Sequence, residues 1–402
     1  MSRLGKSGNV LPHSKKRCRA TALQTTATDF CLVRPPRPLI LMRCAAIPKI
    51  PGSLTGVVFP FNLQPERMKV LFNCLTPFAL AHGGMQIQIE QTKAALNQAG
   101  VEVDFLKWWD DTQRPDLIHH FGPPSGASAE LIRPKGIKLV VNHLLGGLGV
   151  RPAWQRWLQK NIINSARRTL PAGAFARTGW GAWKTADAYI AITPWEAKLM
   201  VEVFQAPPER VQVVPNGVGD FFFAQPPETR GPWLVTTASI LPVKRLVETA
   251  EAAVAAQTPY WVIGRPFSET DAYFQKFTAL CRRHPKILRH DNVMRTQPQL
   301  AQVYRQARGF VLLSRWETQS LSALEAAACE CPLLLSDLPW AHSTFGETVK
   351  FCPVTHSTAA TAAVLRAFYD AAPVVLPPPK PATWLEIAQQ LKAIYERVLN
   401  QP

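Results

Sequence analysis

From Met68 onward, the chain alternates short apolar runs with longer amphipathic stretches, and this alternation restricts the possible folds more than any other feature. The apolar runs have the length of buried strands, and the stretches between them carry apolar residues at helical spacing. The expected strands are 68–73, 101–106, 116–120, 137–141, 187–192, 211–214, 233–238, 260–264, 309–313 and 333–336. The expected helices include 84–98, 194–204, 244–256, 270–283, 297–307, 320–330 and 356–370. The pattern predicts an α/β fold in which helices cover both faces of parallel sheets.

The alternation is interrupted near residues 219–232, where Gly, Pro and aromatic residues cluster without a period. We therefore expect two facing, doubly wound Rossmann-like domains at 68–218 and 233–376, joined by a linker at 219–232 and separated by a cleft. Residues 377–402 are expected to form a Pro-rich linker and a C-terminal helix that packs on one of the domains as a brace. In such sheets, ligands bind at the carboxyl ends of the strands.

Residues 1–67 lack a clear period and are rich in Arg, Pro, Ser and Thr. They hold four Lys and seven Arg against one Asp and one Glu, so they carry a net +9 of the chain's formal charge of +17. Three interpretations compete: a basic disordered arm, a transit-like segment, or translated sequence upstream of the true start. Met68 stands directly before a buried strand, which favours the third. Aromatic residues are nearly absent from the segment, so no nucleic-acid partner is predicted.

The eight cysteines include no C-x-x-C pair, and Cys329-x-Cys331 is a poor spacing for zinc or a disulfide. We interpret them as reduced thiols in a cytosolic protein. No segment has the ~18 uninterrupted apolar residues that a membrane span requires. These features predict a cytoplasmic protein.

Residues 151–184 combine seven Lys and Arg with four Trp. Basic and Trp residues together can seat a protein on the inner face of an anionic membrane. A solvated helical face backed by core Trp residues explains the same composition. Peripheral membrane contact through 151–184 is therefore one of two interpretations.

Two glutamates, Glu317 and Glu325, follow the apolar run 309–313 and flank the start of the helix expected at 320–330. A helix N-terminus attracts phosphate, and a carboxylate beside it can accept hydrogen bonds from sugar hydroxyls. The pair suggests that the protein holds a nucleotide-sugar. Glu325 also has a local interpretation, because Ser322-x-x-Glu325 fits a capping box that would only stabilise the helix. Glu317 has no such local role and needs either solvent or a partner.

Polar residues and glycines lie at the ends of several expected strands. Gly83 and Gly84 would expose backbone N–H groups at a helix start, although a simple βα turn also explains them. His119 and His143 can each hydrogen-bond a sugar, a phosphate or merely a backbone group. The Gly-rich loop after His143 makes it the better functional candidate. Asn216 belongs to an Asn-Gly turn, for which a structural role is sufficient.

Lys244 and Arg245 stand just before a helix, where cations oppose the helix dipole. A bound anion would remove this conflict, so the two side chains are candidates to grip a diphosphate. A solvated basic turn explains the two cations equally well.

In combination and order, these motifs resemble the retaining nucleotide-sugar glycosyltransferases of family 4, which have the GT-B fold. The resemblance covers roughly residues 68–400 and is strongest in the second domain. There, residues 317–326 match the family's E-G-F-G-L…E-A segment, and 329–337 match the A-x-G-x-P-V-V run that follows it. Residues 187–193 and the turn at 215–218 also look like family motifs.

The resemblance implies a role for each matching residue. Glu325 would bind the donor ribose, Glu317 would contact the transferred sugar, and Lys244 would stabilise the leaving diphosphate. Residues Thr318, Gln319, Ser320 and Leu321 would line the donor site, with the backbone N–H groups of 319–321 facing phosphate. Gly83 and Gly84 would face phosphate or the acceptor, and His143 would bond the donor sugar.

Two departures from the family pattern bear on these roles. Ser239 stands where the family has an Arg five residues before the Lys, and we expect Arg245 to supply the missing charge. Thr318 and Ser320 replace two glycines, which predicts a narrower pocket and a different accepted sugar.

The implied reaction is transfer of a hexose-type sugar from a nucleoside-diphosphate donor to an acceptor hydroxyl, with retention, in polysaccharide, glycolipid or other glycoconjugate synthesis. The acceptor is expected to be a carbohydrate or lipid-linked, and no cofactor is expected beside the donor. No D-x-D motif occurs at a suitable strand end, so metal independence is predicted. A nucleotide-sugar epimerase of the same fold and a non-catalytic sugar-nucleotide-binding protein are the alternatives.

Overall fold

The computed structural model describes residues 67–74, 77–78, 83–123, 131–223, 228–294 and 296–401. The chain divides into two units between Asn62 and Leu63, and all described residues belong to the second. The expectations for residues 1–66 therefore lie outside the described part of the chain, as do Cys18, Cys31 and Cys44.

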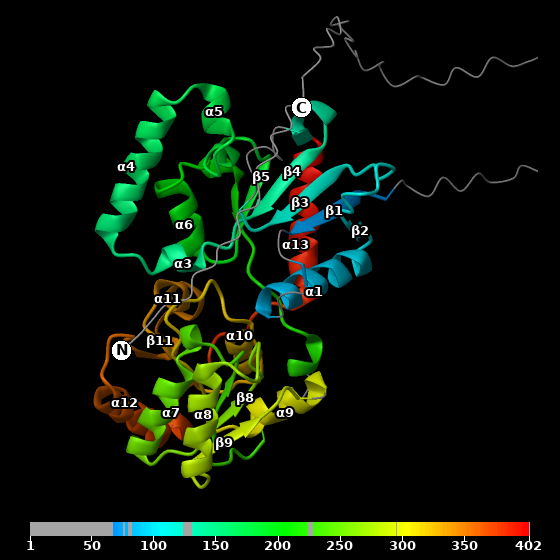
Figure 1. The fold of residues 1–402 in the computed structure, drawn as a ribbon. Coiled ribbons are helices and arrows are strands. Elements are labelled where there is room, and N and C mark those ends of the chain that lie inside the picture. The colour runs from blue at the N-terminus through cyan, green and yellow to red at the C-terminus, as the bar shows by residue number, and fades with distance from the viewer. Residues whose placement is uncertain are drawn as a thin grey trace, which may run out of the picture. The chain divides into compact units, whose positions relative to one another are not determined.

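The first six strands form one parallel sheet in the order β2-β1-β3-β4-β5-β6 (Figure 1). They are β1 (Lys69–Cys74), β2 (Glu102–Phe105), β3 (Leu117–Phe121), β4 (Lys138–Asn142), β5 (Ala188–Ala191) and β6 (Val211–Val213). Successive side chains point to opposite faces, so Val70 and Phe72 enter one core while Leu71 enters the other. The longer helices of this part are α1 (Gly84–Gln98), α4 (Ala153–Thr169) and α6 (Pro194–Glu202); α3 (Gly146–Gly149) and α5 (Ala172–Ala176) are short. We call this sheet with its helices the first lobe.

The remaining six strands form a second parallel sheet in the order β12-β11-β10-β7-β8-β9, the second lobe. They are β7 (Leu234–Thr237), β8 (Tyr260–Ile263), β9 (Leu288–Asp291), β10 (Gly309–Leu312), β11 (Leu333–Ser336) and β12 (Lys350–Cys352). One core contains residues of α9 (Gln297–Gln306), α10 (Leu321–Ala328) and α11 (Pro339–Phe345). The other contains residues of α7 (Leu246–Ala256), α8 (Ala272–Arg283) and α12 (Thr358–Ala371). Both faces of the sheet are therefore covered.

The predicted fold class is confirmed: the chain forms two parallel six-stranded sheets with helices on both faces. All ten predicted strands are present within about two residues of their expected bounds. Strands β9 and β12 and helices α3, α4, α5 and α11 were not predicted.

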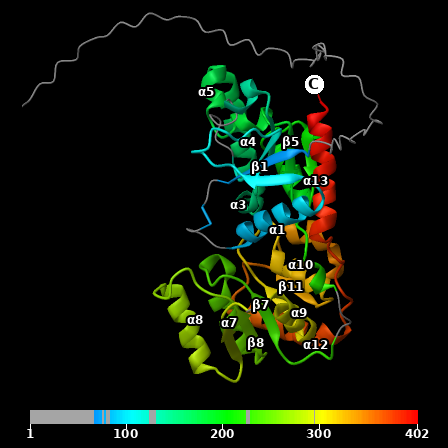
Figure 2. The ribbon, with the colours of Figure 1, turned by 90° about the vertical axis from the view of Figure 1, so that its right-hand side faces the viewer.

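The C-terminal helix α13 (Trp384–Leu399) belongs to the first lobe, although the second lobe precedes it in the chain. Ile387, Leu391 and Tyr395 are buried in the core that also contains Val70 and Phe72. Figure 2 shows α13 beside α1. Thr383 and Glu386 form a complete capping box at its start. The helix therefore closes one face of the first sheet.

The described residues of the expected linker at 219–232 pack on the second lobe. Phe222 lies in a short 3-10 turn, Asp220–Phe222, and is buried in the core of that lobe. The Arg230 guanidinium donates to the carbonyl oxygens of Ala307, at 3.0 Å, and Glu330, at 2.7 Å.

Cys281, Cys329, Cys331 and Cys352 are free thiols, and the last three are buried. In the part of the chain that the structure describes, none of the helices combines the length and apolar character needed to cross a bilayer.

Candidate functional site

The strand order of the second sheet indicates where a ligand would bind. Strands β7 and β10 are neighbours, and the chain leaves them in opposite directions, toward β8 and toward β11. At such a switch point the loops after the two strands diverge and leave a crevice at the carboxyl ends. Lys244 lies in the loop after β7, and Glu317 lies in the loop after β10.

The loop after β7 holds Lys244 at the end of a short 3-10 turn, Pro242–Lys244. Arg245 follows with φ 52° and ψ 37°, a left-handed conformation that costs a non-glycine residue about 1–2 kcal/mol. This residue separates the turn from α7. The N–H of Arg315 donates to the Val243 carbonyl at 2.8 Å, so the two loops are joined by backbone as well as by side chains.

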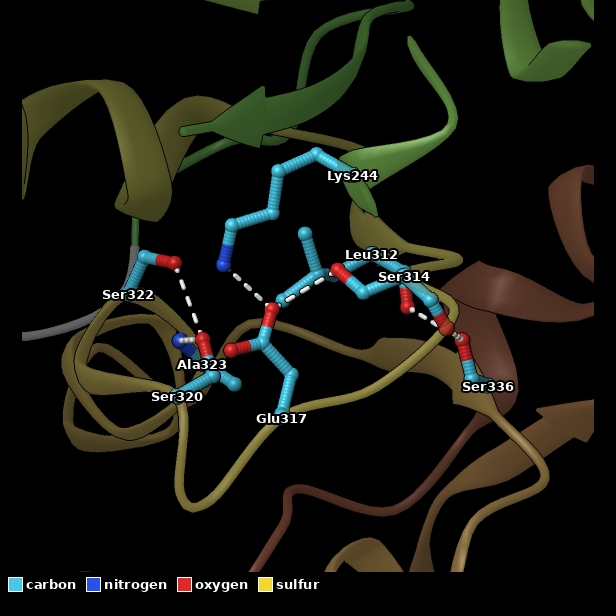
Figure 3. A network of polar contacts seen from close by, with 8 residues as sticks. All are labelled: Lys244, Leu312, Ser314, Glu317, Ser320, Ser322, Ala323 and Ser336. Atoms are coloured by element: carbon cyan, nitrogen blue, oxygen red, sulfur yellow. Dashed lines mark hydrogen bonds and ion pairs between the residues drawn. The ribbon is translucent and has the colours of Figure 1, made fainter. Parts of the chain in front are cut away.

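The Lys244 ammonium forms an ion pair with Oε1 of Glu317, as Figure 3 shows. The same oxygen accepts a hydrogen bond from Ser314 Oγ at 2.7 Å. Ser336, at the end of β11, donates to the Ser314 carbonyl at 2.6 Å. The side chains of Lys244 and Glu317 are only 23% and 11% exposed, so both charges are largely removed from water and depend on each other. Glu317 therefore has the partner that the sequence required.

Helix α10 begins at Leu321, and Ser320 is its N-cap residue. The Ser320 hydroxyl accepts the N–H of Ala323 at 3.2 Å and lies 3.1 Å from the Ser322 hydroxyl (Figure 3). The predicted capping box of Ser322 and Glu325 is therefore wrong, because the N-cap residue is Ser320, two residues before Ser322. Glu325 lies in the second turn of the helix and has no role in the cap.

Glu325 is joined instead to the side chains of α9 and β7. Its Oε2 accepts a hydrogen bond from the Tyr304 hydroxyl at 3.3 Å, and that hydroxyl also bonds Thr237 Oγ1. Glu325 as a whole is half-buried, but its carboxyl group is shielded from water. This burial raises its pKa to about 8, although the bond from Tyr304 acts in the opposite direction. At neutral pH the group is mainly a protonated carboxylic acid, which can both donate and accept hydrogen bonds.

The raised pKa of Glu325 predicts a pH-dependent stability. Above its ordinary pKa of 4.5 the unfolded chain loses this proton, whereas the folded protein keeps it until about pH 8. The stabilisation is complete below about pH 4.5 and is lost as the pH rises through 8. The buried histidines His119 and His143 have the opposite effect up to their ordinary pKa of 6.5, because only the unfolded chain protonates them. The net free energy of unfolding, measured with urea, should therefore fall with pH only above about pH 6.5, and it should fall less steeply in Glu325→Gln. An unchanged slope in the variant would contradict the assignment. Burial also raises the pKa of Glu196, to about 7, so part of the slope should remain.

Residues of the first lobe contact the loop that carries Glu317. The N–H of Asn216 donates to Gln319 Oε1 at 2.8 Å. Gly146 lies so close that a Cβ there would contact Thr318 Oγ1 and stand 3.1 Å from Thr318 N. A Cβ on Gly84, the first residue of α1, would lie 3.9 Å from Leu321 Cδ1. Asn216 and Gly84 thus lie next to the stretch 318–321, which the sequence analysis expected to line the donor site.

Three predicted site residues, His119, His143 and Arg245, make no hydrogen bond or ion pair with the residues of this cluster in the described part of the chain. His119 is buried under α13, with Nδ1 2.6 Å from the Tyr395 hydroxyl, which gives it a structural partner. His143 stacks on Trp183, with ring centroids 4.1 Å apart. Burial lowers the pKa of each histidine to about 3, so both rings are neutral. Arg245 is buried at the start of α7 and, among the described residues, forms no ion pair with Glu317, so its expected charge compensation stays a prediction.

Glu196 was missed by the sequence analysis, although it fixes the loop after β4. Its carboxyl oxygens accept the N–H groups of Leu145, at 2.6 Å, and Ile192, at 2.8 Å. Leu145 directly precedes Gly146, which packs on Thr318. The Thr193-x-x-Glu196 pattern was the available signal, and Thr193 does cap α6 by accepting the N–H of Glu196.

Within the described residues, no group of three or more His, Cys, Asp or Glu side chains is arranged to hold a metal ion.

Two family descriptions match the sequence, one in each lobe. Residues 102–217 match the family described as "Glycosyl transferase 4-like domain". Residues 234–370 match "Glycosyl transferases group 1". The second match contains Lys244, Glu317 and Glu325, and the first contains His143 and Asn216. No curated protein matches this chain.

Several solved structures share the fold at low sequence identity. A glycosyltransferase from Rickettsia africae is 11% identical, with a TM-score of 0.56 over 84% of this chain and 100% of its own. Sucrose-phosphate synthase from Thermosynechococcus elongatus is 17% identical, with a TM-score of 0.57 over 83% and 99%. HepE from Anabaena, solved with UDP and glucose, is 13% identical, with a TM-score of 0.54 over 83% and 98%. At this identity the likeness shows the fold alone.

Proposed function

This chain belongs to the glycosyltransferases of the GT-B superfamily, which transfer a sugar from a nucleotide-sugar, and we propose that it is a member of family 4 that transfers the sugar to an acceptor hydroxyl with retention of configuration. The observation that carries the proposal is the Lys244–Glu317 ion pair at the switch point between β7 and β10. It places a cation and a carboxylate side by side where a doubly wound sheet receives its ligand.

Each residue of the site has a role in this proposal. Lys244 stabilises the negative charge that develops on the diphosphate as the bond from the sugar C1 to the phosphate oxygen breaks. The N-terminus of α10, beyond Ser320, contributes N–H groups to the same phosphates. Glu317 contacts the transferred sugar, and Glu325 bonds the ribose hydroxyls. The acceptor oxygen attacks C1 on the face that the diphosphate leaves, and the acceptor's hydroxyl proton passes to the departing phosphate oxygen.

The first lobe supplies further proposed contacts. His143 bonds the donor sugar as a neutral imidazole. Gly83 and Gly84 stand at the start of α1, where backbone N–H groups can meet phosphate or acceptor. Gly83 has φ 154°, a conformation that favours glycine. Because Lys244 and helix N-termini supply the positive charge, we propose that the transfer needs no metal.

The acceptor is proposed to be a carbohydrate or a lipid-linked molecule. The free thiols of Cys281, Cys329, Cys331 and Cys352 fit a reducing compartment, and we propose a cytoplasmic protein. Contact with the inner face of a membrane through residues 151–184 would bring the site close to a lipid-linked acceptor.

A donor screen tests the proposed function. Nucleotide-sugars are added one at a time, and UDP-glucose is the first choice because HepE was solved with UDP and glucose. A donor present at 100 times its Kd should stabilise the folded protein by about 2.7 kcal/mol and raise its Tm. Each stabilising donor is then assayed for release of nucleoside diphosphate. Slow release supports a transferase, binding without release supports a non-catalytic module, and no stabilisation by any nucleotide-sugar would contradict the proposal.

A further inference from the structure

Helix α4 presents its apolar side chains to solvent. Trp154, Trp157, Leu158 and Ile162 are 63%, 66%, 44% and 47% exposed, and Ile163 is the only residue of the helix that is buried. Their spacing of three, four and eight residues from Trp154 places them on one face. A helix on a globular protein ordinarily buries its apolar stripe against the core. Helix α4 therefore turns its apolar face to solvent rather than to the core.

The opposite face of α4 is attached to the first lobe through cations and aromatic rings. The Arg156 guanidinium lies 5.1 Å from the centroid of the Trp195 ring, and the Arg167 guanidinium lies 5.6 Å from the Phe175 ring. Arg167 also bonds the Gln205 side chain. Phe175 lies in α5, which packs beside α4 (Figure 1). These contacts fix the apolar face outward.

The surroundings of this face are strongly positive. Residues 150–186 contain five Arg and two Lys and no Asp or Glu. Arg151, Lys160 and Arg168 are exposed, and they lie before, along and near the end of α4. The composition left two interpretations for the Trp residues of this segment. Trp183 is a core residue, only 1% exposed, whereas Trp154 and Trp157 are not.

We propose that this face of α4, defined by Trp154, Trp157, Leu158 and Ile162, docks on an anionic lipid bilayer. Trp side chains favour the boundary between headgroups and acyl chains, where Leu158 and Ile162 also lose contact with water. Arg151, Lys160 and Arg168 would meet lipid phosphates near the surface.

The charge and composition of the face favour lipid over other partners. A second copy would bring two clusters of seven cations together without a compensating acid. Nucleic acid would suit the cations and could stack on Trp154 and Trp157, but it would leave Leu158 and Ile162 without an apolar partner, which a bilayer supplies. The inference does not depend on sugar transfer, because α4 lies outside the donor site.

Flotation with lipid vesicles tests the proposal on the full chain. We expect binding to vesicles of phosphatidylcholine mixed with phosphatidylglycerol, none to phosphatidylcholine alone, and a loss of binding at high salt. Trp154→Ser with Trp157→Ser should weaken binding about tenfold or more, and so should Lys160→Glu with Arg168→Glu. The matched control is Trp108→Ser with Trp109→Ser, a pair that is 92% and 78% exposed outside α4 and should keep full binding.

Residues 1–67 are themselves basic and are present in every variant, so any binding they cause is common to all. The α4 variants should keep the melting temperature and the donor hydrolysis of the parent protein. Flotation of the α4 variants equal to that of the parent would overturn the proposal, as would no flotation at low salt. A dimer that only the α4 variants lose, or RNA binding lost in them without vesicle binding, would assign the face to those partners instead.

Discussion

Replacing Lys244 with Ala should lower kcat for nucleotide-sugar turnover by about 10²–10³-fold, or roughly 3–4 kcal/mol of barrier. In the proposed transition state this ammonium faces the departing diphosphate in a site shielded from water, where no other described cation contacts Glu317. Its removal also leaves the Glu317 carboxylate, 11% exposed, without its positive partner. Steady-state kinetics should show the loss mainly in kcat, because the charge it stabilises develops as the bond breaks.

The ion pair between Lys276 and Glu251 provides a matched control. It lies in the same lobe, with Nζ and Oε1 2.9 Å apart, but the Lys276 side chain is 57% exposed. Lys276→Ala should leave kcat unchanged, because an exposed pair contributes about 1 kcal/mol or less to stability and none to the site. Equal kcat values for Lys244→Ala and the parent protein would contradict the assignment of Lys244 to the diphosphate site.

Glu317→Gln should lower kcat by at least about a hundredfold while the protein stays folded. The amide has the shape of the carboxylate and can still accept hydrogen bonds from Lys244 and Ser314, but it cannot stabilise the positive charge that develops on the sugar ring. Circular dichroism melting and single-turnover kinetics should separate these effects, with a small change in Tm and a large change in rate.

Glu251→Gln is the control for this change, since it removes a carboxylate from the exposed pair of the same lobe. A large fall in melting temperature that accompanies the loss of activity would identify Glu317 as a structural partner of Lys244 only. If the two residues act as a unit, the double variant Lys244→Ala with Glu317→Gln should lose little more than either single one.

The sequence predicted every strand inside the two sheets and the edge strands β2 and β6, but it missed the edge strands β9 and β12. Strands β10 and β11 are almost entirely apolar, because both of their faces are buried. Strand β9 reads Leu-Arg-His-Asp and β12 reads Lys-Phe-Cys. An edge strand meets the core on fewer sides, so its sequence carries little apolar signal. Helix α4 was not among the predicted helices, although Trp154, Trp157, Leu158 and Ile162 recur at helical spacing in the sequence.

The positions of the site residues were predictable, but most of their contacts were not. Lys244 and Glu317 were each expected at the end of a strand, yet they are 73 residues apart. Their pairing depends on β10 lying beside β7, which no local pattern encodes. The bond from Tyr304 to Glu325 likewise joins two helices. The capping box at Ser322 failed because Ser320 offers the same chemistry two residues earlier.

The most direct measurement is a titration of the nucleotide-sugar found in the donor screen, and of its nucleoside diphosphate, into the parent protein and the variants. The account predicts that Lys244→Ala weakens binding of the nucleoside diphosphate about tenfold or more, since a charge-assisted bond to phosphate contributes about 1.5–3 kcal/mol. Lys276→Ala should bind both ligands like the parent protein. Equal affinity of the parent protein and Lys244→Ala for the nucleoside diphosphate would contradict a diphosphate site between β7 and β10.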